Sequence, residues 1–273
     1  MSTAAADTRE VGPLLRTWRV RRHFSQQDLS DRSSVSTRHL SRVETGRAHP
    51  TPEMILHLAD CLDVPLRERN RLLLAGGYAP RYQDGGLDGA SVAVVMEGLR
   101  QLLDAHLPYP ALLLDDYWDV IDYNAGVDAL LAGCAAELLE PPVNVVRLCL
   151  HREGLAPRIG NFDQWASHLL HQITHRAERT HDPRHLALAE EARMHLAGTR
   201  PTAPTGSPVL TLELAAADGH PLRFFSTSAQ LTAPTDAALE GVRMETFLPA
   251  DASTRERFVR LSRTTPQRAP AGE

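Results

Sequence analysis

The sequence lacks lysine and has no long apolar run. All 29 basic residues are arginine, a bias that we attribute to GC-rich coding. No stretch approaches the ~18 to 20 consecutive apolar residues of a membrane-spanning helix. Residues 1–10 have neither the basic start nor the apolar run of a secretory signal. We therefore expect a cytoplasmic protein that does not associate with membranes.

Cysteine is scarce, and the common motifs of enzymes are missing. The three cysteines, Cys61, Cys134 and Cys149, cannot all pair, and no two of them have the C-x-x-C spacing of zinc or thioredoxin-like sites. There is no Gly-rich phosphate loop, no H-E-x-x-H and no G-x-S-x-G. We therefore expect no disulfide framework, no metal site built from cysteine, no cofactor and no enzymatic activity.

The charge is distributed unevenly along the chain. Residues 1–82 hold 13 arginines against nine acidic residues, a net charge of +4, whereas the rest holds 16 against 25, a net charge of −9. A basic segment suits a polyanion such as DNA, and an acidic segment is repelled by one. A length of 273 residues, with 42% hydrophobic and 23% charged, fits roughly two globular domains of ~150 residues each. The two parts therefore have different predicted partners.

Five short helices are predicted in the basic segment. Ser25 is a suitable N-cap, and Asp28 lies three positions later, where its carboxylate can accept from the cap amide. Ser36 and Thr51 are suitable caps for two further helices, and Gly46 suits a left-handed C-terminal cap. The predicted helices cover residues 14–24, 26–33, 37–45, 52–62 and 65–75.

A motif spans the second and third of these helices. It consists of Ser25-Gln26-x-x-Leu29-Ser30, followed by Val35-Ser36-x-x-x-Leu40-Ser41-x-x-Glu44-x-Gly46. The pattern closely resembles the XRE family of DNA-binding domains, which includes phage Cro and repressor-like proteins. Ser34 departs from it, because the family usually has glycine in this turn, and a left-handed serine has a modest backbone cost. The resemblance implies an all-α five-helix helix-turn-helix (HTH) domain that binds DNA.

The third helix is the predicted recognition helix, because the major groove admits one α-helix. Its inward residues are Leu40 and Val43, which leaves Thr37, Arg38, Ser41 and Arg42 on the outer face. An arginine that makes two hydrogen bonds to guanine contributes ~1 to 3 kcal/mol of base discrimination. By position in the family, Gln26 bonds the phosphate backbone. Further phosphate contacts are expected from Arg47 and from Arg19 or Arg22.

A glycine-rich polar stretch at residues 82–89 predicts a domain boundary near residue 85. Apolar spacing then predicts a connecting helix over 91–106. Strands are predicted over 111–114 and 120–123, with Asn124 capping a helix that runs to residue 131. Helices over 161–179 and 183–197 and strands over 209–217, 222–230 and 242–249 follow. The pattern predicts an α+β domain, with helices on one side of a five-stranded antiparallel sheet.

Three stretches in this second part form a further pattern. They are Pro110-Ala111-Leu112-Leu113 through Asn124, then Glu140-Pro141-Pro142-Val143-Asn144-Val145-Val146-Arg147-Leu148, and finally Phe224-Phe225-Ser226-Thr227. With this order and placement, residues 108–258 resemble the MmyB-like ligand-binding domain that follows an XRE domain in bacterial transcription regulators. The resemblance implies a PAS-like pocket for an apolar or amphipathic small molecule, such as a fatty acid, without catalysis.

A pocket of this kind needs only a few polar groups in an apolar wall. The candidate ligand-binding residues are Trp118, Asn144, Arg147, His151 and Arg158. Arg147 is a candidate partner for a ligand carboxylate. The alternative interpretation is that Asn144 caps a short helix and Arg147 makes a structural ion pair.

A second hypothesis starts from the histidines. His168, His171 and His175 share one face of a predicted helix, and His181 and His185 follow. Imidazole is the commonest transition-metal ligand. No carboxylate or cysteine completes a known metal motif, which favours a chance cluster on a solvated helix. Cys149 is a candidate redox thiol, although burial would make it inert. The alternative function is a metal or redox sensor that uses the HTH fold to bind a protein.

The predicted organisation is a DNA-binding domain over residues 1–80, a linker and connecting helix over 81–107, a ligand-binding domain over 108–258 and a C-terminal tail over 259–273. The predicted function is that of a transcription regulator that binds a specific DNA operator and senses a small effector. We expect a homodimer on a two-fold symmetric site. Dimer formation would double the DNA contacts and set the half-site spacing at ~34 Å, one helical turn.

Overall fold

The computed structural model describes residues 10–196, 209–216 and 219–264. The chain forms two compact units. Unit 1 comprises the described part of Met1–Gly89 together with Ala233–Glu240, and unit 2 comprises the described parts of Ala90–Thr232 and Gly241–Glu273. Residue 197 of the predicted helix, residue 217 of the predicted strand and residues 265–273 of the predicted tail lie outside the described residues.

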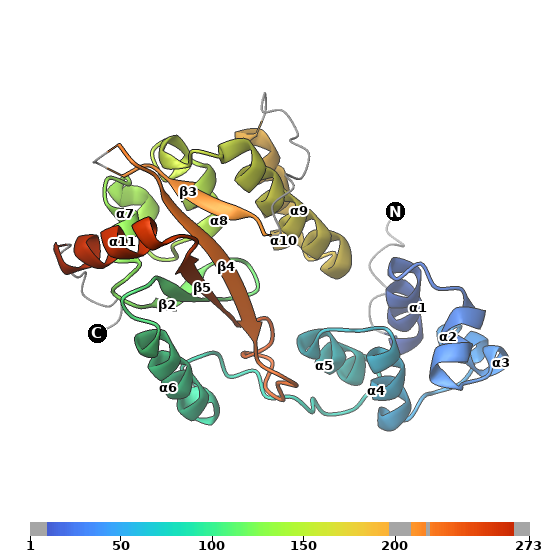
Figure 1. Ribbon diagram of the computed structural model, residues 1–273. Helices are drawn as coiled ribbons and strands as arrows, with labels where there is room; N and C mark the ends of the chain where they lie inside the picture. The colour runs from blue at the N-terminus through green and yellow to red at the C-terminus, as the bar shows by residue number, and fades with distance from the viewer. Residues whose placement is uncertain (1–9, 197–208, 217–218, 265–273) are drawn as a thin grey trace. The chain divides into compact units, whose positions relative to one another are not determined.

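Unit 1 has five α-helices in its described residues (Figure 1). They are α1 (Val11–Arg21), α2 (Gln26–Ser33), α3 (Thr37–Glu44), α4 (Pro52–Cys61) and α5 (Leu66–Ala75). Their apolar sides form one core, which includes Leu15, Leu40, Ile55 and Leu72, each at most 2% exposed. The predicted all-α HTH region is therefore confirmed. The main difference is α1, which begins three residues earlier than expected.

Local hydrogen bonding explains where α2 and α3 begin and end. Ser25 and Asp28 form a capping box, because the Ser25 amide donates to the Asp28 carboxylate at 2.7 Å and the Asp28 amide donates to Ser25 Oγ at 3.1 Å. Ser34 ends α2 in the left-handed conformation, with φ 56°. Gly46 follows α3 with φ 70°, a value that suits glycine. The predicted turn geometry is confirmed at each of these positions.

Unit 2 contains a five-stranded antiparallel sheet in its described residues, with the strand order β2-β1-β5-β4-β3 (Figure 1). The strands are β1 (Ala111–Leu114), β2 (Val120–Tyr123), β3 (Thr211–Leu214), β4 (Leu222–Gln230) and β5 (Arg243–Pro249). The predicted antiparallel sheet is confirmed. Its central strand is β5, the last strand in the sequence, which pairs with both β1 and β4.

Helices contact both faces of this sheet. The main core of unit 2 includes Trp118, Cys149, Trp165, Phe224 and Phe258. Leu112 and Leu114 of β1 belong to this core, whereas Ala111 and Leu113 belong to a smaller cluster with Leu103. Residues that alternate along a strand point to opposite faces. Leu103 lies on α6 (Ala90–Ala105), so this connecting helix packs on the face opposite the main core. The prediction that the helices lie on one side is therefore wrong.

The remaining helices of unit 2 are α7 (Asp128–Leu131), α8 (Val145–Leu150), α9 (Phe162–Thr180), α10 (Pro183–His195) and α11 (Ala252–Thr264). Short 3-10 helices occur at Ala136–Leu139 and Ala156–Arg158. No helix or strand was predicted over residues 252–264, where the structure has α11. Phe258 of α11 is nevertheless fully buried against Phe224 of β4, with ring centroids 5.2 Å apart.

Asn124 does not cap a helix as predicted. Its Oδ1 accepts hydrogen bonds from the amides of Ala111 and Gly126, both at 3.1 Å, and its Nδ2 donates to the carbonyl oxygens of Leu103 and Tyr109. The buried side chain therefore satisfies four backbone groups around the start of β1. The helix that follows, α7, begins only at Asp128.

Candidate nucleic-acid interface and ligand-binding site

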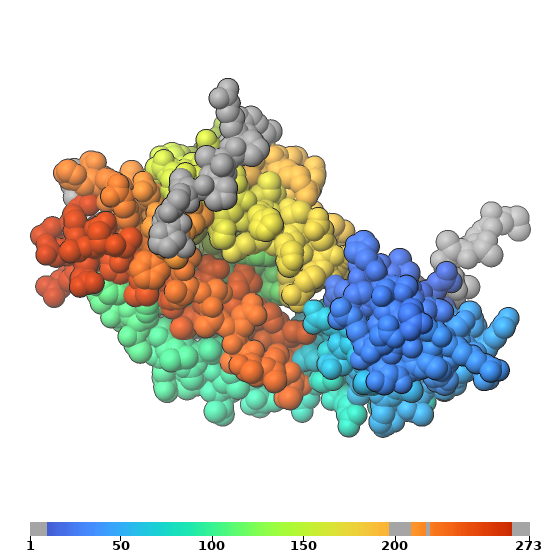
Figure 2. All heavy atoms as spheres, turned by 45° about the vertical axis from the view of Figure 1, so that its right-hand side comes forward, coloured from blue at the N-terminus to red at the C-terminus, as the bar shows by residue number. Residues whose placement is uncertain are grey.

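The outer face of α3 carries the side chains predicted to contact bases. Arg38 and Arg42 are exposed and Thr37 and Ser41 are half-buried, whereas Leu40 and Val43 are 1% exposed. Within the described residues, neither arginine side chain has an ion-pair or hydrogen-bond partner. In Figure 2 the blue atoms of α2 and α3 form part of the surface of unit 1. These guanidinium groups are therefore accessible to a partner.

The Glu44 carboxylate at the end of α3 holds three helices together. Arg19 of α1 donates from Nε at 2.6 Å and from Nη2 at 2.9 Å to its two oxygens, and Gln26 Nε2 of α2 donates to Oε2 at 2.9 Å. Arg19 is 9% exposed and Glu44 is 6% exposed. The hydrogen bond to Glu44 raises the pKa of Arg19. These contacts fix the orientation of α3 relative to α1 and α2.

Gly12 allows α1 to cross α3 at very short range. A Cβ built on Gly12 would lie 2.2 Å from the carbonyl oxygen of Val43, a distance that no side chain tolerates. The predicted helix began at residue 14, so Gly12 lay outside it, whereas α1 begins at Val11. Glycine inside a helix is unfavourable by ~0.5 to 1 kcal/mol relative to alanine. Its presence here marks a close approach of two backbones.

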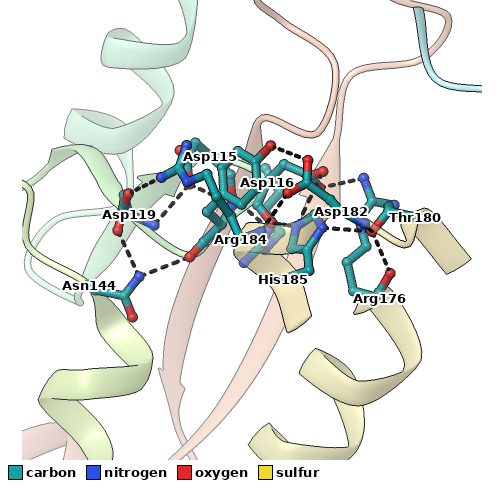
Figure 3. A network of polar contacts seen from close by, with 11 residues as sticks. Asp115, Asp116, Asp119, Asn144, Arg176, Thr180, Asp182, Arg184 and His185 are labelled. Carbon is teal, nitrogen blue, oxygen red and sulfur yellow. Dashed lines mark hydrogen bonds and ion pairs between the residues drawn. The ribbon is translucent and has the colours of Figure 1, made fainter. Parts of the chain in front are cut away.

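In unit 2, the turn between β1 and β2 is the centre of a polar network (Figure 3). Asp115 Oδ1 accepts from the amides of Tyr117 at 2.8 Å and Asp119 at 2.9 Å, which fixes the turn. Burial raises the pKa of Asp115, and the two backbone hydrogen bonds oppose that shift. Trp118 adopts a left-handed backbone with φ 64°, which turns its ring into the main core.

His185 of α10 connects the turn to the helical pair α9–α10. The residue is 1% exposed. Its Nε2 lies 2.9 Å from the carbonyl oxygen of Asp116, and its Nδ1 lies 2.7 Å from Thr180 Oγ1. The imidazole stacks on Tyr117, with ring centroids 4.6 Å apart. Both ring nitrogens are thus engaged, and the imidazole serves as a structural connection between the turn and α10.

Charged groups reinforce this connection. Arg176 of α9 forms an ion pair with Asp116 (Figure 3). Arg184 of α10 forms a second ion pair, in which its Nη2 lies 3.2 Å from Asp119 Oδ2. Tyr117 Oη donates to Asp182 Oδ2 at 2.9 Å. Burial, together with this hydrogen bond, raises the pKa of Tyr117 to about 12. The turn and the helical pair are therefore joined by several independent contacts.

Beside this network lie buried hydrogen-bond donors that have no partner in the part of the chain that the structure describes. Arg243, at the start of β5, donates from Nη1 to the carbonyl oxygen of Asp115 at 2.9 Å, and its guanidinium lies 4.6 Å from the Trp118 ring centroid. Within the described residues, Arg243 Nη2, Trp118 Nε1 and Arg176 Nε have no hydrogen-bond partner. Buried donors are normally satisfied. Within the described residues, these three donors are therefore exceptions to that rule.

Comparison with known families accounts for both units. A family described as the MmyB-like transcription regulator ligand binding domain matches residues 95–261, which is more than half of the chain. The chain belongs to this family. A helix-turn-helix domain family matches residues 10–72. No curated protein matches the chain.

The regulator therefore joins an HTH domain, the DNA-binding part, to a ligand-binding domain of the MmyB-like type. It is a DNA-binding transcription regulator, as the sequence resemblance implied. Neither family is one of enzymes. Among the described helices, none has the length and the hydropathy of a membrane span.

Two of the predicted ligand-binding residues of the regulator lie in the polar network or next to it. Trp118 is 5% exposed and packs against Arg243. Asn144 is also 5% exposed, but its Oδ1 accepts from the Val146 and Arg147 amides at the start of α8, and its Nδ2 donates to Asp119 Oδ1 at 2.7 Å. Asn144 thus caps a short helix, the alternative considered above.

The other three predicted residues have contacts elsewhere in unit 2. Arg147 forms a two-point ion pair with Glu191, at 2.8 and 3.0 Å. His151 Nδ1 accepts from the amide of Glu153 at 3.1 Å. Arg158 Nη1 donates to two carbonyl oxygens at the end of α7, at 2.8 and 2.7 Å. Each of these side chains therefore has a structural partner within unit 2, and their assignment to ligand binding stays a prediction.

The histidines and Cys149 give the metal- or redox-sensing hypothesis no support. Within the described ranges, no three histidine, cysteine or acidic residues gather as metal ligands. Burial lowers the pKa of His168, and Gln172 contacts its ring. Cys149 is buried in the main core, which raises its pKa to about 12. A thiol with that pKa stays protonated near neutral pH and is a poor nucleophile.

Proposed function

We propose that α3 enters the major groove of a specific DNA operator and reads its sequence. Arg38 and Arg42 would contact base edges, with Thr37 and Ser41 beside them. Gln26 and Arg47 would bind phosphates and set the position of the helix. One N–H of the Gln26 amide is bonded to Glu44, which leaves the second for a phosphate. In this respect the regulator acts like an XRE-family protein.

One observation carries this proposal: α3 is buried on one side, and the arginines on its other side have no partner among the described residues. Leu40, Val43 and Glu44 are 1 to 6% exposed, while the guanidinium groups of Arg38 and Arg42, one helical turn apart, are exposed and lack a partner within the described residues. If the outer face of α3 packed against another part of the protein, Arg38 and Arg42 would be buried and paired. The domain over residues 1–80 is thus our proposed DNA-binding part.

Titration of a DNA duplex at several salt concentrations tests this proposal. A phosphate that is neutralised by an arginine releases a counterion, so each such contact makes the slope of log affinity against log salt about 0.9 more negative. We expect a slope of about −4 or steeper for a dimer that makes several contacts per subunit. A flat salt response would contradict DNA binding and favour a protein partner.

We infer that residues 108–258 form a PAS-like sensor for a small apolar or amphipathic molecule, such as a fatty acid. The donors of Trp118 and Arg243 that have no partner within the described residues, next to an apolar core, support this inference. Apolar walls with a few polar groups are typical of small-molecule sites.

Native mass spectrometry of the purified chain would detect a co-purified molecule. Loss of that molecule in Trp118→Phe would support the site, whereas retention in both Trp118→Phe and Arg243→Met would contradict it.

We further propose that the regulator acts as a homodimer on a two-fold symmetric operator. Two copies of α3 would then occupy successive major grooves, ~34 Å apart. The same mass spectra report the number of subunits, with and without an operator duplex. A single subunit bound to a duplex that contains both half-sites would contradict the dimer.

A further inference from the structure

The segment Ala233–Glu240 lies between β4 and β5 in the sequence, yet it belongs to unit 1 by its contacts. Asp236 pairs with Gln83 in a parallel bridge, and the Ala237 amide donates to the Gln83 carbonyl oxygen at 2.8 Å. Asp236, Ala237, Ala238 and Leu239 are 3 to 8% exposed. The segment is therefore a packed part of the DNA-binding unit and not a solvated loop.

Glu240 ends this segment and caps α5. Its Oε2 accepts a hydrogen bond from the Leu66 amide at 2.7 Å, although the two residues are 174 positions apart. The local N-cap residue, Pro65, makes no side-chain cap. The first turn of a helix leaves amides without partners, and a carboxylate there is favourable. A residue from the far end of the sequence thus supplies the cap that α5 lacks.

The surface that receives the segment is itself held in place. Asn70 of α5 accepts hydrogen bonds from the amides of Arg81 and Tyr82, at 3.0 and 3.1 Å, and donates to the Tyr82 carbonyl oxygen at 2.8 Å. These bonds fix the chain immediately before Gln83. Both sites that the segment uses, the start of α5 and Gln83, therefore depend on the position of α5.

The residues that follow Glu240 contact the polar network of unit 2. A Cβ built on Gly241 would lie 2.7 Å from Cβ of Asp116, so the chain passes very close to the β1–β2 turn. Arg243, two residues later, donates to the Asp115 carbonyl oxygen and packs on Trp118. Only Gly241 and Val242 thus separate Glu240 from Arg243, whose Nη2 has no hydrogen-bond partner among the described residues. A movement of the β1–β2 turn would therefore displace Gly241 and Arg243, and with them Glu240, because these residues are adjacent in the chain.

We propose that the 233–240 segment transmits the ligand state of unit 2 to the DNA-binding unit, through the cap that Glu240 places on α5. Leu72 and Leu73 of α5 share a core with Leu15 and Trp18 of α1, and α1 contacts α3 through Gly12 and Arg19. Release of the cap therefore loosens the support of the recognition helix. This proposal rests on the DNA-binding and ligand-binding functions proposed above.

Hydrogen exchange of the full chain, measured by mass spectrometry, tests the proposal. The samples are the wild type, Glu240→Ala, Glu240→Gln and the control Glu256→Ala, an exposed glutamate of α11. We expect Glu240→Ala to speed hydrogen exchange of the amides at the start of α5 about fivefold, because loss of a helix N-cap changes the opening equilibrium by about that factor. Glu240→Gln keeps an acceptor oxygen and should have a smaller effect, and the control should have none. Unchanged exchange at Leu66 in Glu240→Ala would overturn the proposal.

The transmission is tested with a DNA duplex that the wild type selects from a random library. Coupling between two sites is reciprocal, so DNA binding must alter the ligand-binding unit. We expect the duplex to change exchange at residues 241–246 in the wild type at least about twofold, and to leave them unchanged in Glu240→Ala. No change in the DNA-bound wild type, or an equal change in both chains, would overturn the proposal. If no chain binds the duplex, the proposed DNA-binding function fails instead, and exchange at Leu66 still tests the cap.

Discussion

Gly12 of α1 and the carbonyl group of Val43 in α3 are in direct contact, with no room for a side chain between them. We predict that Gly12→Ala forces the two helices apart and lowers the free energy of unfolding by about 1 to 3 kcal/mol, the usual cost of overpacking. Urea unfolding monitored by circular dichroism measures this change. DNA affinity should fall as well, because α3 moves.

Gly98→Ala is the matched control for this substitution. Gly98 lies exposed within α6, and a Cβ there meets nothing within 4 Å. Alanine should therefore stabilise the helix by about 0.5 to 1 kcal/mol. Equal effects of the two substitutions would show that the contact between Gly12 and Val43 has no energetic importance.

The ion pair between Arg19 and Glu44 leads to a prediction of non-additivity. Glu44→Ala leaves a buried guanidinium without its partner and should cost about 3 to 5 kcal/mol. The double variant Arg19→Met/Glu44→Leu removes both charges and fills the space, so it should cost much less than the sum of the single changes. Chemical unfolding of the single and double variants gives the coupling energy. Additive costs would contradict the pairing.

The Asp115 carboxylate has a predicted pH dependence. Burial raises the pKa of Asp115 above its ordinary value of 3.8, so the fold disfavours the charged form. The penalty is absent below the pKa of the unfolded chain and is fully present above the raised pKa of the folded chain. Asp115→Asn keeps an oxygen for the two amide donors and removes the charge. We expect it to raise the free energy of unfolding at pH 7, with a difference that shrinks as the pH falls toward 3.8. A difference that does not depend on pH would contradict this explanation.

Cys149 should be unreactive in the folded protein. Because burial raises its pKa to about 12, its thiolate is rare at pH 8. Iodoacetamide labelling followed by peptide mass spectrometry should leave Cys149 unmodified in native protein and modify it in urea. The half-buried Cys134 serves as an internal reference. Rapid labelling of Cys149 in native protein would contradict this prediction and would support the redox-sensing hypothesis.

The HTH helices could be predicted from sequence because their signals are local. Ser25 and Asp28 cap one helix within four residues, and Gly46 ends another. The strands of the sheet could also be predicted, since their apolar patterns are local as well. The start of α1 was missed, because Gly12 is explained only by a contact with residues more than 30 positions away.

The candidate ligand site was harder to predict, because its geometry comes from residues far apart in the sequence. Arg243 and Trp118 meet only after β5 has paired with β1, and nothing in the local sequence of Arg243 indicates this. The cap of Glu240 on Leu66 is more distant still. Conversely, the polar residues at 144–158 were conspicuous in the sequence, but the structure gives several of them partners within the protein. Asn144 caps α8, whereas Arg147 and Arg158 bond to Glu191 and Leu130, which lie far from them in the sequence.

The most direct test of the central proposal is selection of DNA sites from a random library by the wild type, Arg38→Ala, Arg42→Ala and the control Arg255→Ala. Arg255 is exposed on α11. Removing a base contact should cost about 1 to 3 kcal/mol and relax preference at one position of each half-site. We predict such a loss at a different position for each α3 variant and an unchanged site for the control. Selection of the same site by all four chains, with undiminished preference, would contradict the assignment of α3 as the recognition helix.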